Sequence, residues 1–170
     1  YKDYVAKISG EYKPSYSVIS FVGNFDPAKS SAKYADAIYV IYKDKDIKKY
    51  LELMDEYFKL MGENATPADY GKAAQNLYYA AGKKLAPADH EIAINWVEKA
   101  LTGETSVVDR INYLVMIGDS YTAIKKYEDA TKYYRQGYVE SLQLNNMTQV
   151  QAMIQATIAR KLATLELLQK

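Results

Sequence analysis

Apolar positions recur along this chain at the three- and four-residue spacing of amphipathic helices, and short polar breaks separate the runs. The breaks carry residues that begin helices. Asp26 and Thr66 each stand as a capping residue before a proline, and Asp69 can close a capping box with Thr66. Ser106 and Asp109 form a second box of this kind. We therefore expect helix starts at these three places.

The ends of the runs are also marked. Gly62 and Gly103 each follow an apolar run, as left-handed helix ends do, and Asn145-Asn146 separates two further runs. Together these signals predict helices over residues 29–43, 46–61, 67–84, 88–102, 107–124, 127–143 and 147–169.

The first 25 residues follow a different pattern. Tyr1 to Ile8 reads as the end of a helix stopped by Gly10, and Pro14 to Val22 reads as a short helix. The alternation in Pro14 to Val22 also permits a strand, but nothing else in the chain offers a strand for it to pair with. The sequence thus divides into an N-terminal segment, 1–25, and a helical domain, 26–170.

One stretch has a pattern of its own: INYLVMIGDSYTAIKKYEDATKYYRQGY. Its spacing describes two antiparallel helices that meet where a small residue on one lets the other approach. The matching positions are Leu114, Ile117, Gly118, Tyr121, Ala130, Tyr134 and Gly137. This order and spacing resemble the tetratricopeptide (TPR) repeat, whose signature spans about 34 residues.

Parts of the pattern recur upstream, so that the resemblance covers residues 30–143. The first-helix spacing repeats at Tyr34, Ala37, Ile38 and Ile41 and at Tyr70, Ala73, Ala74 and Leu77, and the second-helix spacing repeats at Ala93, Val97 and Ala100. The copies depart from the signature in three ways. The middle copy has an insertion of about two helical turns, the first has Tyr50 and Tyr57 where small residues are expected, and Leu142 stands where a closing proline would.

The resemblance implies an all-α fold, a right-handed superhelix of antiparallel helix hairpins (a TPR-like α-solenoid) with a C-terminal capping helix. A solenoid needs such a helix to cover its last exposed core. The closing helix has an apolar stripe, with two further apolar residues beside it and a polar set that we expect on the opposite face. The apolar stripe is Val150, Ile154, Ile158, Leu162 and Leu165, and the residues beside it are Met153 and Leu168. The polar set is Gln151, Gln155, Lys161 and Glu166.

Composition narrows the class of function. Lys plus Arg is 22 against 21 for Asp plus Glu, so that no net charge draws the chain to nucleic acid or to an anionic membrane. No apolar run approaches the ~18 residues of a membrane span, and no cysteine is present. We expect an excised or processed piece of a longer protein, because the chain starts at Tyr1 within a charged helical pattern. That start favours, weakly, an extracytoplasmic location.

The titratable residues do not form a catalytic pattern, and we expect no enzyme activity, cofactor or metal. His90 is the only histidine, and near a helix start we expect it to be exposed and structural. Ser120 lies within a helix rather than on the sharp turn of a nucleophile elbow. Phosphate-binding glycine motifs are absent. Trp96 is expected to pack against the neighbouring repeat.

The sequence therefore predicts an interaction scaffold that binds a protein or peptide in a concave groove. In TPR proteins the first helix of each pair lines this groove. By that analogy the groove residues are Gln75, Tyr78, Tyr79, Asn112, Val115, Met116, Asp119 and Thr122. Val115 and Asp119 stand where some TPR proteins hold a carboxylate clamp, so we expect no such clamp. The alternative is an accessory helical domain of a larger protein, for example a secreted thioredoxin-like enzyme, whose chemistry lies elsewhere.

Overall fold

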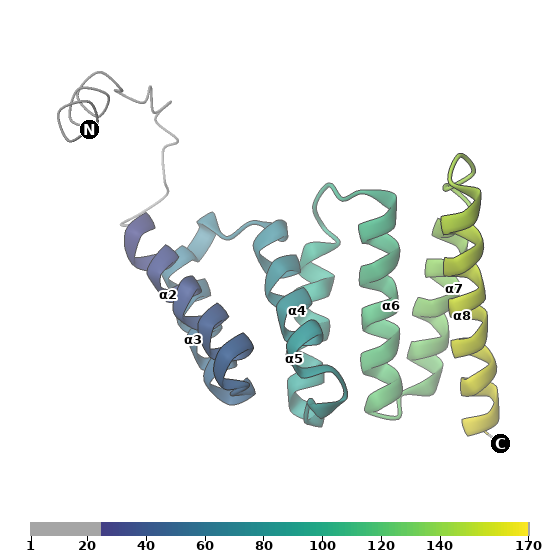
Figure 1. Ribbon diagram of the computed structural model, residues 1–170, viewed down its shortest axis with the longest axis horizontal. Coiled ribbons are helices and arrows are strands. Elements are labelled where there is room, and N and C mark those ends of the chain that lie inside the picture. The colour runs from purple at the N-terminus through teal and green to yellow at the C-terminus, as the bar shows by residue number, and fades with distance from the viewer. Residues whose placement is uncertain (1–24, 170) are drawn as a thin grey trace.

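The computed structural model describes residues 25–169 and every side chain among them except that of Lys83. Regular structure in this range is entirely helical. The α-helices are α2 (Pro27–Tyr39), α3 (Ile47–Met61), α4 (Pro67–Ala81), α5 (Pro87–Ala100), α6 (Val107–Ala123), α7 (Tyr127–Ser141) and α8 (Thr148–Leu168). They stand in a row in chain order (Figure 1), and consecutive helices pack against one another.

The helices start where the capping residues predict. Asp26 Oδ1 accepts hydrogen bonds from the backbone N–H groups of Ala28 and Lys29, which begins α2. Thr66 and Asp69 form a reciprocal capping box at α4. These side chains satisfy N–H groups that a helix leaves without an internal partner. The predicted N-terminal helices of residues 1–8 and 14–22 lie outside the described residues.

The helix ends differ from the prediction at two glycines. Gly62 has a φ of 52°, which favours glycine, but so does Gly82, at 51°, where we had expected the helix to continue. Gly103 is not in the left-handed region. A Cβ added there would lie 2.6 Å from Pro67 Cβ, so Gly103 serves close packing against the start of α4 instead.

Two short irregular turns extend the helices. A π-helical turn, η1 (Val40–Asp44), continues α2, and a 3-10 turn, η3 (Gly82–Lys84), continues α4. A 3-10 turn, η2 (Gly62–Asn64), follows α3. The η3 turn lies in the region where the middle repeat has its insertion. The extra residues extend the end of α4 and the start of α5 as well as the connection between them.

The helices enclose two clusters of buried side chains. The larger runs from α2 to α6, and the smaller joins α6, α7 and α8. Tyr50 is fully buried in the larger cluster, and its hydroxyl donates to the carbonyl of Ala73 over 2.8 Å. Trp96 of α5 packs between Tyr50 and Phe58 of α3, at ring-centroid distances of 6.4 and 5.7 Å. The prediction that Trp96 packs against the neighbouring repeat is confirmed.

The closing helix turns its faces differently from the prediction. Ile158 and Leu165 are buried, as expected. Gln151 and Gln155, however, flank this stripe and donate hydrogen bonds to Ser141 of α7. The expected opposite-face position of these glutamines is therefore wrong. The exposed surface of α8 is mixed: it carries the apolar residues Ala152, Met153, Ala156, Ala159, Ala163, Leu167 and Leu168 and the polar residues Thr148, Gln149, Thr157, Arg160, Thr164 and Glu166.

Candidate functional site

The hairpin of α6 and α7 is held close by one glycine. A Cβ at Gly118 would lie 2.4 Å from the ring of Tyr134, so only glycine allows the aromatic side chain to cross here. This confirms the predicted contact between Gly118 and Tyr134. The ring is 2% exposed, and its hydroxyl emerges on the far side of α6, next to Asp119.

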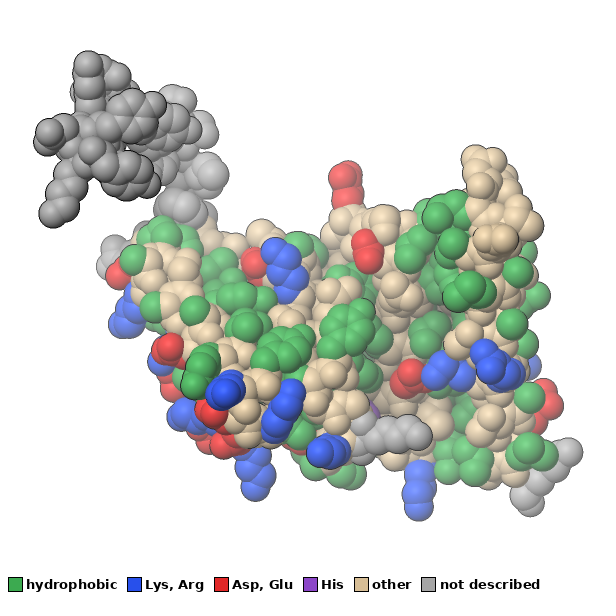
Figure 2. Space-filling model, in the orientation of Figure 1, with side chains coloured by type: hydrophobic (Ala, Val, Ile, Leu, Met, Phe, Trp, Pro, Cys, Tyr) green, Lys and Arg blue, Asp and Glu red, His purple; other side chains and the backbone are tan. Residues whose placement is uncertain are grey.

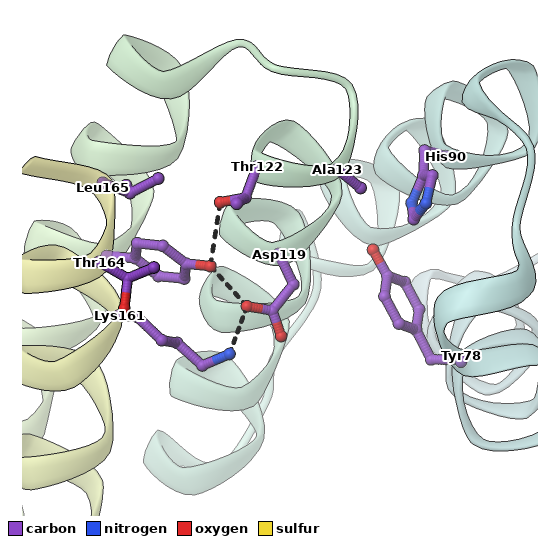
Figure 3. Close-up of a pocket in the computed structure, with 10 residues that line it drawn as sticks. Tyr78, His90, Asp119, Thr122, Ala123, Lys161, Thr164 and Leu165 are labelled. Atoms are coloured by element: carbon purple, nitrogen blue, oxygen red, sulfur yellow. Dashed lines mark hydrogen bonds and ion pairs between the residues drawn. The ribbon is translucent and has the colours of Figure 1, made fainter. Parts of the chain in front are cut away.

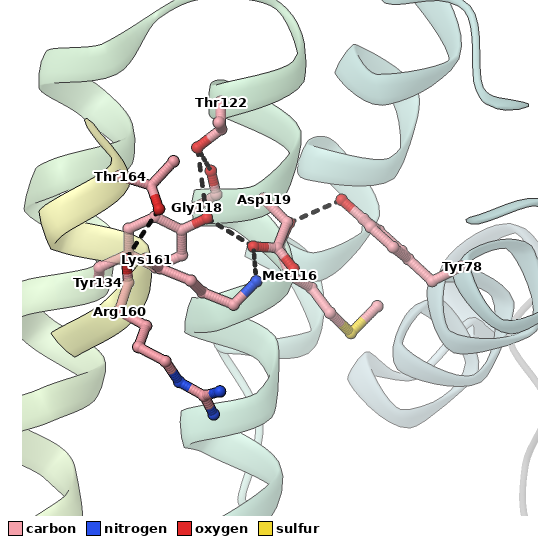
Figure 4. Close-up of polar contacts among 9 residues, drawn as sticks. All are labelled: Tyr78, Met116, Gly118, Asp119, Thr122, Tyr134, Arg160, Lys161 and Thr164. Atoms are coloured by element: carbon pink, nitrogen blue, oxygen red, sulfur yellow. Dashed lines mark hydrogen bonds and ion pairs between the residues drawn. The ribbon is translucent and has the colours of Figure 1, made fainter. Parts of the chain in front are cut away.

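That hydroxyl belongs to a compact polar cluster that ties three helices together (Figure 4). Tyr134 donates to Asp119 Oδ1 over 2.5 Å, and Lys161 of α8 reaches the same oxygen over 2.5 Å. Thr122 also hydrogen bonds with the Tyr134 hydroxyl, at 3.3 Å. Burial, and then the neighbouring Asp119 charge, raise the pKa of Tyr134, so the phenol stays protonated and continues to donate.

A second tyrosine joins α4 to α6. Tyr78 donates to the backbone carbonyl of Met116 over 2.7 Å. Burial is the main cause that raises the pKa of Tyr78, with a smaller contribution from the Asp119 charge. The two tyrosines thus bracket Asp119, one from α4 and one from α7.

These residues surround a cavity of about 560 Å³ (Figure 3). Five helices and the turn after α4 contribute to it. Its walls are mainly apolar, with hydroxyl, imidazole and carboxylate groups at separate points. The lining residues are Tyr78, Gly82, His90, Asp119, Thr122, Ala123, Tyr134, Lys161, Thr164 and Leu165.

His90 is buried, so the expectation of an exposed histidine is wrong. α5 lies so close to α6 that the His90 ring meets Ser120, with Nδ1 3.1 Å from Oγ. Burial lowers the pKa of His90, against a smaller opposing effect of Asp89, so the neutral ring is favoured. The pair of side chains is a hydrogen-bonded contact of two helices at the edge of the cavity.

The structure brings together some of the predicted groove residues. Tyr78, Asp119 and Thr122 line the cavity. Met116 is half-buried beside Tyr78 (Figure 4), while Val115 packs into the cluster shared with α8. Tyr79 and Asn112 are exposed, and Gln75 lines a separate hollow between α4 and the α5–α6 loop. Three of the eight residues thus share the cavity, and the other five do not line it.

Sequence reasoning missed the contribution of α8. Lys161 and Thr164 project into the cavity, although we had expected Lys161 on the opposite face. A closer look at helical spacing could have found it, because Lys161 is three residues after the buried Ile158 and four before the buried Leu165. Such a position borders the buried stripe.

No group of three His, Cys, Asp or Glu side chains in residues 25–169 could hold a metal ion, and no helix there has the length and apolar character to cross a membrane. Acidic and basic side chains lie next to one another along the lower edge of the molecule (Figure 2), without a field of one sign.

Over the described residues the protein is all-helical, with antiparallel hairpins and a cavity lined by α4, α5, α6, α7 and α8. Comparisons with protein-family models, curated proteins and solved structures found no significant match.

Proposed function

We propose that this chain is a TPR-like helical scaffold that binds a segment of another protein in the cavity between α4, α6 and α8. The observation that carries the proposal is that Tyr78 and Asp119, on the first helices of two successive hairpins, open into one cavity. Predicted groove residues from separate repeats therefore meet where a ligand could contact both.

The chemistry of the cavity indicates what kind of segment it would take. Lys161 neutralises Asp119, so neither sign of charge dominates the cavity. Leu165 and Ala123 supply apolar surface. The Thr122 and Thr164 hydroxyls donate to the carbonyls of Gly118 and Arg160, so they can accept hydrogen bonds from the N–H groups of a peptide backbone. A peptide with a large apolar side chain and an uncharged flank fits these walls best.

The cavity is also braced before any ligand arrives. Tyr134, Asp119 and Lys161 connect α6, α7 and α8 through bonds at 2.5 Å, so the walls keep their positions. Preformed walls reduce the ordering cost of binding.

Selection from a random peptide display library on the immobilised chain, followed by titration of the enriched peptides, tests this function. Ala123 is exposed and lines the cavity, so Ala123→Trp should fill it without disturbing the core. We expect this variant to weaken the selected peptides by about 1–2 kcal/mol or more. Ala159→Trp, on the far side of α8, is the matched control and should leave their affinity unchanged.

The proposal is wrong if no peptide is enriched or if the enriched peptides bind Ala123→Trp as tightly as the unmodified chain. Circular dichroism of both variants ensures that the comparison is made between folded proteins.

A further inference from the structure

The second helices of the hairpins stack on one another through an aromatic side chain. Trp96 of α5 contacts Phe58 of α3, with ring centroids 5.7 Å apart. One hairpin later, the Tyr133 hydroxyl of α7 donates to Glu98 of α5 over 2.9 Å. Trp96 and Tyr133 occupy the same position of the repeat, three residues after Ala93 and Ala130.

The residues that contact this aromatic side chain, Phe58 on α3 and Glu98 on α5, have counterparts at the matching repeat positions of α7. We call these the receiving positions. Phe58 stands one residue after Tyr57, as Tyr138 stands one residue after Gly137, and these are matching positions of the repeat. Glu98 likewise follows Val97 as Arg135 follows Tyr134. On α7 the receiving positions are therefore Tyr138 and Arg135.

On α7 both of these positions are exposed. Tyr138 and Val139 are 38% and 62% exposed. Together with Arg135 of α7 and with Ala159 and Leu162 of α8, they line a hollow of about 340 Å³. We call these five residues the end face. The hollow lies between the last two helices, next to the receiving positions.

The surroundings of the end face are also unusual for the end of a helical array. Terminal repeats ordinarily turn a polar surface outward, because the apolar core would otherwise be wet. Here Met153 and Leu167 of α8 are 71% and 72% exposed, and Leu142, the residue after α7, is 56% exposed. Apolar surface of this kind marks a place where another chain segment binds.

Charge indicates the chemistry of the occupant. Where α5 has the acceptor Glu98, α7 has Arg135, and Arg135 forms no ion pair within residues 25–169. A helix that stacks here would meet a guanidinium instead of a carboxylate, so an acidic side chain would complement it.

We propose that the end face docks an amphipathic helix of a partner protein, which places an aromatic ring against Tyr138 and a carboxylate against Arg135. The face continues the stacking interface that α3 presents to α5 and α5 presents to α7. This surface is separate from the cavity between α4, α6 and α8, and binding at one does not require the other.

The chain itself supplies a probe, a synthetic peptide of residues 87–101, which carries Trp96 and three acidic residues. We would titrate it into the isotope-labelled chain and follow backbone amide resonances. Shifts are expected at Tyr138, Val139, Ala159 and Leu162. The same peptide with Trp96→Ala should bind about tenfold more weakly, as expected when an interface anchor is truncated.

Matched variants of the protein separate the end face from the cavity. Ala159→Trp fills the hollow and should weaken the peptide about tenfold, and Arg135→Glu should weaken it about fivefold with a smaller effect at high salt. Ala123→Trp fills the cavity and should change nothing.

Three results would overturn the proposal. One is the absence of shifts at the end face up to about 1 mM peptide. Another is binding that Ala159→Trp does not weaken. The third is a dimer of the chain in sedimentation equilibrium that Ala159→Trp dissociates, because the occupant would then be a second copy.

Discussion

The first and last complete hairpins carry their buried tyrosine at different positions of the second helix. In the hairpin of α6 and α7, Gly118 on the first helix makes room for Tyr134 on the second. In the hairpin of α2 and α3, the second helix carries Tyr50 where α7 has the small Ala130, and the Tyr50 ring is fully buried. The position of the aromatic moves, while the packing of two antiparallel helices is kept.

The two aromatic side chains also connect to different neighbours. The Tyr50 hydroxyl reaches the backbone of α4, at Ala73. The Tyr134 hydroxyl reaches the Asp119 side chain, at the wall of the cavity. The first hairpin thus uses its buried tyrosine to join the next hairpin, and the last uses it to position a polar group. The buried tyrosine therefore connects two hairpins at one end of the molecule and positions Asp119 at the cavity wall near the other end.

The largest loss of stability is expected when the buried tyrosine ring of the first hairpin is removed. Tyr50→Ala should lower the free energy of unfolding by about 3–5 kcal/mol, because a fully buried ring is lost and a cavity remains. Tyr79 is 76% exposed, so Tyr79→Ala is the control and should stay within about 0.5 kcal/mol. Urea denaturation measures both. Similar losses in the two variants would contradict the burial of Tyr50.

The next largest loss of stability is expected when a larger side chain is placed where α6 and α7 cross. Gly118→Leu places carbon atoms inside the Tyr134 ring and should cost about 1–3 kcal/mol. Gly137 lies on the same hairpin, but a Cβ there meets its nearest neighbour at an ordinary 3.5 Å. Gly137→Ala should therefore be neutral or stabilise the protein by up to about 1 kcal/mol. An unchanged denaturation midpoint for Gly118→Leu would show that the crossing is elsewhere.

A smaller loss is expected when only the polar end of the crossing is removed. Tyr134→Phe keeps the ring against Gly118 and removes the hydrogen bond to Asp119, so it should cost about 1 kcal/mol. Tyr133→Phe also removes a tyrosine-to-carboxylate bond, but at an exposed site, and serves as the comparison. If Tyr134→Phe costs no more than Tyr133→Phe, the cluster at Asp119 adds nothing to stability.

The smallest effect concerns pH and the contact between α5 and α6. Burial lowers the pKa of His90, so below about pH 6.5 the unfolded chain takes up a proton that the folded chain resists. The free energy of unfolding should therefore fall as the pH drops from 7.5 to 5.5. His90→Gln should flatten this dependence. A slope that persists unchanged in His90→Gln would assign it to other groups.

The helices were predictable from the sequence because their signals are local. Thr66 and Asp69, three residues apart, form hydrogen bonds that begin α4. The spacing of the residues around Gly118 predicted that α7 crosses α6 closely at this glycine. The polar cluster was not predictable in the same way. Lys161 binds Asp119, which lies 42 residues earlier in the sequence. Whether the Lys161 side chain points toward Asp119 depends on the rotation of α8 about its axis as it packs.

Burial of polar residues was the other source of error. His90 stands three residues into α5, a position that is usually exposed, and only the closeness of α6 covers it. The same applies to Gln151 and Gln155, whose amides find Ser141 only when α7 and α8 are docked. A helix sequence shows which faces are apolar, but the partner helix decides which polar groups at their border become buried.

Trp96 gives this molecule an optical reporter of its own. The chain has one tryptophan and 18 tyrosines. The Trp96 ring lies between the rings of Tyr50 and Phe58. Its emission therefore senses the junction of α3 and α5 alone, whereas tyrosine absorbance samples the whole chain. Following both signals during denaturation would show whether the two ends of the molecule melt together or one hairpin at a time.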